Sequence, residues 1–126
     1  MIIGLGIDQI EIARVARTLA RYGERFGRRV YTTAEWKYCL SKPNPAESLA
    51  GRFAAKEATM KALGLGWPAG IAYRDIEITR DLAGKPGLKL CHLAARRAEQ
   101  IGAVRTVVSM AHDRTFSQAT VVMEGA

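Results

Sequence analysis

The chain of 126 residues has little of what marks several classes of protein. Its two cysteines, Cys39 and Cys91, cannot build a disulfide framework or, alone, a cysteine-rich zinc site. Aromatic residues make up 7% of the chain, too few for a platform that stacks nucleic-acid bases. No apolar run approaches the ~18 residues that cross a membrane. Residues 1–4 lack the basic region of a signal peptide, so we expect a protein of the reducing cytoplasm without a membrane partner.

The rest of the composition is that of an ordinary globular chain. Apolar residues make up 48% and charged residues 25%, which argues against disorder. Because domains usually hold ~100–200 residues, we expect residues 1–126 to form one domain. The net charge of +7 predicts an anionic partner. Charge alone leaves open a nucleic acid, an anionic membrane, a phosphorylated small molecule or an acidic protein.

Hydrophobic periodicity predicts an α+β fold, with helices packed on one side of an antiparallel sheet. Helical patterns fill most of residues 8–63 and return at residues 92–101. Residues 64–70, rich in glycine and proline, are typical of a loop. Alternating apolar residues predict strands at residues 2–8, 75–79, 87–90, 104–111 and 117–123, the second and third joined by a turn.

Two predicted helices carry explicit signals at their ends. Residues 8–11 have the form of a capping box, which predicts that the first helix opens at Asp8. Asn44 can cap a long later helix, with Pro45 at its first position and Glu47 three residues after the cap. Gly64 can end that helix as the residue that follows its last turn.

Residues 10–30 hold six arginines and two glutamates. If the first helix continues past Gly23, five of these arginines share one face, opposite an apolar face. A solvated surface is the simplest explanation, and a docking surface for an acidic partner is the alternative. The five arginines are Arg14, Arg17, Arg21, Arg25 and Arg28.

Two carboxylates and a lysine are the candidates for chemistry. Phe53, Glu57 and Lys61 are spaced four residues apart and so share one helix face. The simple interpretation is an exposed Glu57–Lys61 ion pair, with Asp8 as a helix cap. The functional interpretation requires Asp8 and Glu57 to meet in space, because Mg²⁺ is usually held by one or two carboxylates together with substrate phosphates.

Five segments, in order, resemble the signatures of one enzyme family. They are GIDQIEIAR at residues 6–14, GRFAAKE followed by KALG within residues 51–64, DIEI at 75–78, GKP at 84–86 and SMAH at 109–112. This pattern resembles the 4′-phosphopantetheinyl transferase superfamily, in its short, single-repeat branch. The likeness runs from residue 2 to residue 123 and implies that family's fold. Trp67 and Pro68 depart from the small or aliphatic residues usual in that loop.

The resemblance implies an activity: transfer of 4′-phosphopantetheine from coenzyme A to a serine of an acyl carrier protein, releasing adenosine 3′,5′-bisphosphate. It implies that Asp8 and Glu57 ligate Mg²⁺, whose charge offsets that building on the diphosphate. It also implies that Glu57 accepts the serine proton, directly or through a water on the metal. Lys61 would neutralise or protonate the leaving phosphate.

The resemblance further implies binding partners for the basic residues. Acyl carrier proteins are acidic, and Arg14, Arg17, Arg21 and Arg25 would dock one. Family members form homotrimers with coenzyme A in clefts between subunits, so we expect that assembly here. The residues that would bind coenzyme A are Arg52, Lys61, Gly64, Lys85, Pro86 and His112.

The alternative function is that of a small basic nucleic-acid-binding module. It explains the net charge of +7 and the arginine-rich helix. It does not explain Asp8 and Glu57 in their motifs, or the scarcity of aromatic residues, so we expect no nucleic-acid partner. A catalytically inactive relative is disfavoured because Asp8, Glu57 and Lys61 are all present.

Overall fold

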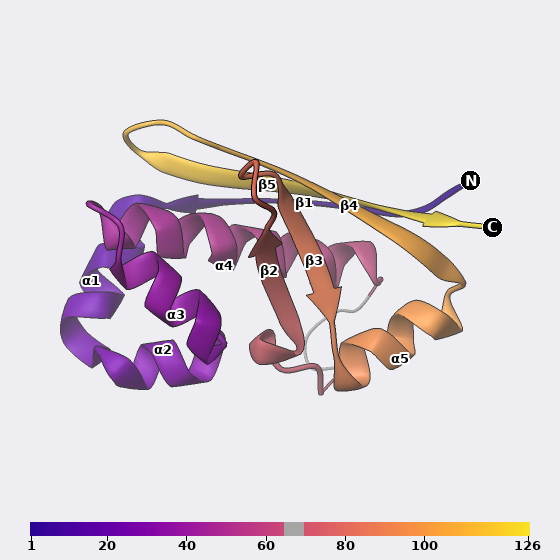
Figure 1. The fold of residues 1–126 in the computed structure, drawn as a ribbon, viewed down its shortest axis with the longest axis horizontal. Coiled ribbons are helices and arrows are strands. Elements are labelled where there is room, and N and C mark those ends of the chain that lie inside the picture. Colours follow the sequence, from indigo (N-terminus) through magenta and orange to yellow (C-terminus); the bar gives the residue numbers. More distant parts are fainter. Residues whose placement is uncertain (65–69) are drawn as a thin grey trace.

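The computed structural model describes residues 1–64 and 70–126 (Figure 1). The loop predicted at 64–70 lies outside the described residues except for its two end glycines, and the departure at Trp67 and Pro68 lies outside them entirely. The elements in chain order are β1 (Ile2–Glu11), α1 (Ile12–Tyr22), α2 (Glu24–Val30), α3 (Thr33–Leu40), α4 (Pro45–Ala62), the 3₁₀ turn η1 (Tyr73–Asp75), β2 (Ile76–Arg80), β3 (Pro86–Leu90), α5 (His92–Gln100), β4 (Ala103–His112) and β5 (Phe116–Gly125).

The strands form two antiparallel sheets, and this confirms the predicted α+β class. One sheet has the order β1-β5-β4, and the other is the β2-β3 hairpin. Figure 1 shows α4 lying along one face of the larger sheet, with the other helices on the same side. The core between α4 and the sheet consists of buried alanines of α4 packed against apolar residues of β5, among them Val121 and Met123.

Glycines of β1 let this strand lie directly on α4. A Cβ at Gly6 would overlap the Ala58 carbonyl oxygen and lie 2.9 Å from the Ala62 nitrogen. Alternate residues of a strand point to the same face, so Asp8 faces α4 as Gly6 does. The close approach of β1 to α4 therefore carries Asp8 to the helix that holds Glu57.

The prediction that the first helix opens at Asp8 is wrong. Asp8 lies within β1, where it pairs with Ala119, and the pairing of β1 with β5 continues to Glu11. Helix α1 begins at Ile12, whose N–H donates to the Thr115 carbonyl at 2.8 Å. Backbone pairing with a distant strand thus outweighs the local capping signal in residues 8–11.

The boundaries predicted for α4 are confirmed. The Asn44 side chain accepts a hydrogen bond from the Glu47 N–H at 3.3 Å, and Pro45 is the first helical residue. The helix ends before Gly64, whose φ of +72° is the left-handed conformation that glycine adopts without strain.

A single arginine face across residues 14–28 is not formed. Gly23, with φ of +52°, separates α1 from α2. Arg14, Arg17 and Arg21 therefore lie on α1, while Arg25 lies on α2, which runs in a different direction (Figure 1).

Among the described residues, no helix is both long enough and apolar enough to cross a membrane.

Candidate active site

Asp8 and Glu57 line one pocket of about 490 Å³. We call it the carboxylate pocket; β1, α1, α2, α4 and η1 all contribute to its walls. The structure thus brings together two carboxylates that are far apart in the sequence, as the functional interpretation required. The lining residues are Asp8, Gln9, Ile10, Arg14, Val15, Thr18, Phe26, Phe53, Glu57 and Tyr73.

The polar contacts in this pocket differ from the simple interpretation of the sequence. The Glu57 Oε1 atom accepts a hydrogen bond from the Tyr73 hydroxyl at 2.6 Å. The Lys61 ammonium donates instead to the Ile7 carbonyl at 2.9 Å and to Asp8 Oδ1 at 3.2 Å. The expected Glu57–Lys61 ion pair is therefore replaced by pairs that each join α4 to another element.

Tyr73 keeps its proton in this setting. Burial, the hydrogen bond to Glu57 and the negative charge of that carboxylate raise the pKa of the Tyr73 phenol well above its usual value. At neutral pH the hydroxyl is therefore a donor to Glu57, and the glutamate remains the acceptor.

The carboxylate pocket has a donor set that suits Mg²⁺ shared with a substrate. Mg²⁺ prefers hard oxygen ligands and is commonly held by one or two carboxylates plus phosphate oxygens and waters. Asp8 and Glu57 supply these carboxylates. Within residues 1–64 and 70–126, no three residues among His, Cys, Asp and Glu gather into a complete protein cage. The residues present thus fit a cation that completes its coordination with phosphate oxygens.

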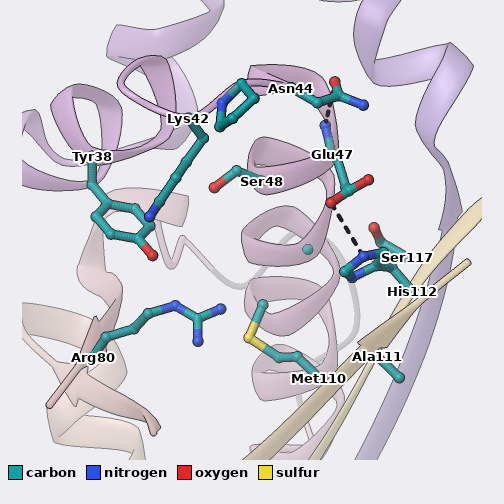
Figure 2. Close-up of a pocket in the computed structure, with 12 residues that line it drawn as sticks. Tyr38, Lys42, Asn44, Glu47, Ser48, Arg80, Met110, Ala111, His112 and Ser117 are labelled. Atoms are coloured by element: carbon teal, nitrogen blue, oxygen red, sulfur yellow. Dashed lines mark hydrogen bonds and ion pairs between the residues drawn. The ribbon is translucent and has the colours of Figure 1, made fainter. Parts of the chain in front are cut away.

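A second pocket, of about 410 Å³, is lined by a lysine, an arginine and a histidine among other residues (Figure 2). We call it the basic pocket; Lys42, Arg80 and His112 reach it from three different parts of the fold. His112 Nε2 lies 3.1 Å from Glu47 Oε1. The other lining residues are Tyr38, Pro43, Asn44, Ser48, Gly51, Met110, Ala111 and Ser117.

The two pockets share no lining residue. In α4 the basic pocket uses Glu47, Ser48 and Gly51, while the carboxylate pocket uses Phe53 and Glu57. At 3.6 residues per turn, these two sets point to nearly opposite sides of the helix. One copy of the chain therefore presents the carboxylates and the basic pocket in different directions.

Arg52 is placed differently from the other residues predicted at the coenzyme A site. It is only 4% exposed, and its guanidinium donates to the Ile78 carbonyl and lies 3.7 Å from Glu35. It also lies 4.5 Å from the centre of the Tyr38 ring, which lines the basic pocket. The geometry thus favours support of the pocket wall over direct contact with a ligand.

The remaining predicted residues lie at the surface. Lys85 occupies the turn between β2 and β3, where its N–H donates to Asp81 at 2.9 Å, and Pro86 opens β3. Gly64 follows α4 and is exposed. Roles for Lys85, Pro86 and Gly64 at coenzyme A stay predictions.

Two of the four arginines predicted to dock a partner lie at or beside the carboxylate pocket. Arg14 lines it directly, and Arg25 lines a neighbouring pocket of about 420 Å³ that shares Phe26 with it. Arg17 and Arg21 are exposed on α1, and Arg17 pairs with Glu11 at 3.7 Å. The surface beside the carboxylates is therefore cationic.

Sequence reasoning missed Lys42, Arg80 and Tyr73. Lys42 lies between α3 and α4, Arg80 ends β2, and Tyr73 forms the turn before β2. The sequence offers little to mark these residues as functional beyond their position near a recognised segment. Lys42 precedes the cap of α4, Tyr73 precedes the DIEI segment, and Arg80 follows it.

Comparison with known proteins identifies the family to which this fold and site belong. Residues 4–116 match the model of the 4′-phosphopantetheinyl transferase superfamily. The chain belongs to this superfamily and is an enzyme, a transferase.

Its relatives point to one member of the superfamily. The chain is 48% identical to the holo-[acyl-carrier-protein] synthase of Nitratidesulfovibrio vulgaris (strain Hildenborough) over 98% of this chain and 99% of that protein. It is 43% identical to that of Koribacter versatilis, with the same coverage.

Solved structures of holo-[acyl-carrier-protein] synthases share the fold. The Neisseria meningitidis holo-[acyl-carrier-protein] synthase has a TM-score of 0.88 at 34% identity, covering 98% of this chain and 99% of that one. The Helicobacter pylori enzyme, solved in complex with coenzyme A, has a TM-score of 0.83 at 30% identity, covering 95% and 99%.

Proposed function

We propose that this protein transfers 4′-phosphopantetheine from coenzyme A to a serine hydroxyl of an apo acyl carrier protein. The reaction depends on Mg²⁺ and releases adenosine 3′,5′-bisphosphate. The observation that carries the proposal is the meeting of Asp8 and Glu57 in one pocket, with the Lys61 ammonium beside Asp8. Relatives named for this activity, one of them solved with coenzyme A, support it.

The chemistry follows from the side chains of the carboxylate pocket. Asp8 and Glu57 would hold Mg²⁺, which offsets charge on the diphosphate when it is bound. Glu57 accepts the proton of the serine hydroxyl, directly or through one water. Lys61 lies one helical turn after Glu57, and its half-exposed ammonium is able to neutralise the phosphate that leaves. Holding the two substrates together supplies much of the remaining acceleration.

Coenzyme A carries a diphosphate and a 3′-phosphate, so it needs cationic groups at more than one point. We assign the basic pocket, with Lys42, Arg80 and His112, to its phosphorylated nucleoside end. Arg52 supports this pocket through Tyr38. Lys85, Pro86 and Gly64 keep the roles at coenzyme A that the family resemblance implies.

The decisive experiment measures the mass of an apo carrier protein after incubation with this enzyme, coenzyme A and Mg²⁺. We expect a gain equal to one phosphopantetheine group. Omission of coenzyme A, or chelation of the metal, should abolish the gain. An unchanged carrier mass with all components present would overturn the proposal.

We further propose that residues 1–126 act as one domain in the cytoplasm, where the free thiols of Cys39 and Cys91 stay reduced.

The enzyme is also proposed to be a homotrimer with active sites between subunits. Among the residues that the structure describes, no helix covers the sheet face turned away from α4 (Figure 1). Leu5 and Ile7 on this face are 64% and 53% exposed, and Leu5, Val122 and Val107 form a row across the three strands. A second copy would bury this apolar row. The two pockets of one copy face different sides of α4. A site that uses both would therefore combine the carboxylate pocket of one copy with the basic pocket of a neighbouring copy.

Complementation between inactive variants tests the shared site. Glu57→Gln and His112→Ala proteins, each of low activity alone, should regain activity when they are dissociated together and reassembled. Random mixing should restore about one quarter of the wild-type rate, since each shared site needs one intact half from each variant. Recovery is measured by carrier mass, and the assembly by sedimentation equilibrium. If the mixture stays as inactive as its components, each site lies within one chain.

Charge reversal tests the proposed carrier-protein surface. Arg14 also lines the carboxylate pocket, so the test uses Arg17→Glu with Arg21→Glu. We expect the KM for carrier protein to rise about 10-fold, because these charges attract an acidic partner. The KM for coenzyme A should stay within about twofold, because that site is assigned elsewhere.

Salt provides a second readout of the same surface. The wild-type KM for carrier protein should rise with ionic strength, since the Debye length is ~10 Å at 0.1 M, and the double variant should respond less. Arg96→Glu with Lys89→Glu, exposed on α5 and β3, is the control with the same charge change. A carrier KM that is equal in wild type and in the Arg17/Arg21 variant would make these arginines ordinary solvated residues.

A further inference from the structure

Among the described residues that line the carboxylate pocket, Tyr73 is the one that donates a hydrogen bond to Glu57 from outside β1 and α4. Its hydroxyl donates to Glu57 Oε1 at 2.6 Å. Its ring stacks on Phe53, with ring centres 5.4 Å apart, and Phe53 lies one helical turn before Glu57. Tyr73 therefore contacts the helix at two consecutive turns of the face that carries Glu57.

A buried lysine holds the backbone of Tyr73 in place. Lys56 is fully buried, and its ammonium donates to the Tyr73 carbonyl at 3.0 Å and to Glu35 Oε1 at 2.7 Å. The other oxygen of Glu35 accepts the Ile78 N–H at 3.1 Å. This network joins α3, α4 and β2 to the turn that holds Tyr73, so the tyrosine is placed by the core rather than by a free loop.

Anchoring of this kind matters because Glu57 is only partly buried, and a long side chain that is partly exposed keeps rotamer freedom unless a partner holds it. Within the described residues, the Tyr73 hydroxyl is the group that hydrogen-bonds its carboxylate. That bond engages Oε1, while Oε2 accepts no hydrogen bond from the described residues. Partners of this type fix the direction in which a ligand carboxylate presents its oxygens.

We propose that Tyr73 is a positioning residue for Glu57. Its hydroxyl holds the carboxylate in the orientation used in the reaction and assigns Oε2 as the oxygen offered to the divalent cation. Lys56 and Glu35 hold the tyrosine in place. This inference rests on the proposed function for the use of Glu57, but the placement of the carboxylate is a property of the free protein.

The test replaces Tyr73 by phenylalanine, which keeps the ring on Phe53 and removes only the hydroxyl. Mn²⁺ alone is the probe, and its binding is followed by electron paramagnetic resonance in the absence of coenzyme A. We expect the Mn²⁺ affinity of Tyr73→Phe to fall about 10-fold, the usual scale for loss of a partner that orients a metal ligand. The kcat for carrier modification should fall by a similar factor, with the KM for coenzyme A changed less than about twofold.

Tyr31→Phe is the matched control. It removes a buried hydroxyl that donates to the Leu49 carbonyl at 2.7 Å, and Tyr31 lines neither the carboxylate pocket nor the basic pocket. We expect this variant to lower Tm while it leaves Mn²⁺ affinity and kcat unchanged. A Tyr73→Phe protein with a lower Tm but wild-type Mn²⁺ affinity and kcat would show that the hydroxyl contributes only to stability. That result overturns the inference.

The measurements distinguish a failure of the proposed function from a failure of the positioning role of Tyr73. If wild-type protein modifies no carrier, the proposed function fails, yet weaker Mn²⁺ binding by Tyr73→Phe would still support the placement of Glu57. If wild-type protein is active and Tyr73→Phe matches it in Mn²⁺ affinity and kcat, the positioning role fails and the proposed function stands.

Discussion

Glu57→Gln is expected to lower the rate of phosphopantetheine transfer by at least about 100-fold, the scale on which general base catalysis operates. The amide keeps the shape and helix propensity of glutamate, and its oxygen is able to accept from Tyr73. It removes the charge that would hold the cation and the group that accepts the serine proton. Initial rates from carrier mass at saturating Mg²⁺ measure the effect.

Asp8→Asn should behave in the same way, because it removes the other anionic ligand and the negative charge that pairs with Lys61. Glu99→Gln is the control, with the same chemical change at an exposed position on α5. Circular dichroism checks that each variant folds. Near-normal turnover of Glu57→Gln under saturating Mg²⁺ would contradict the assignment of both the metal ligand and the proton acceptor.

Gly6→Ala is expected to destabilise the protein by more than about 3 kcal/mol and to reduce transfer with it. Overpacking of a core usually costs about 1–3 kcal/mol, and here the added carbon meets backbone rather than a side chain that is able to turn aside. Strand β1 must then move away from α4 and take Asp8 with it. Urea unfolding measures the stability, and carrier mass measures the rate.

Gly87→Ala is the matched control for the substitution itself. A Cβ at Gly87 would lie 3.0 Å from the side-chain oxygen of Thr79, an exposed residue, rather than against backbone. We expect a change in stability of about 1 kcal/mol or less. If Gly6→Ala proves as stable as wild type, β1 does not lie on α4 as closely as the structure places it.

The elements with local signals were predictable from sequence. Asn44, Pro45 and Gly64 set the ends of α4 through backbone preferences that act within a few residues. The shared face of Glu57 and Lys61 likewise follows from helical periodicity. The β2-β3 hairpin was evident from alternating residues on either side of a turn.

Distant contacts overruled the local signals elsewhere. The capping pattern at residues 8–11 predicted a helix, but these residues form backbone hydrogen bonds with β5 instead. Strand β5 lies more than a hundred residues further along the chain. Arg52 and Lys56 are charged residues that a sequence places at the surface, yet Glu35 and backbone carbonyls satisfy both in the core. Partners that are distant in the chain cannot be identified from a short stretch of sequence.

The sequence by itself therefore determined the class of fold and the family, and it singled out the two carboxylates proposed for the chemistry, because each has a local pattern or motif. Only the tertiary structure decided what each side chain contacts: Lys61 pairs with Asp8, Glu57 accepts from Tyr73, and the basic pocket opens on the other side of α4. The physical reason is that helix and strand propensities act over a few residues, whereas the proposed active site lies where β1, α4 and η1 meet through packing.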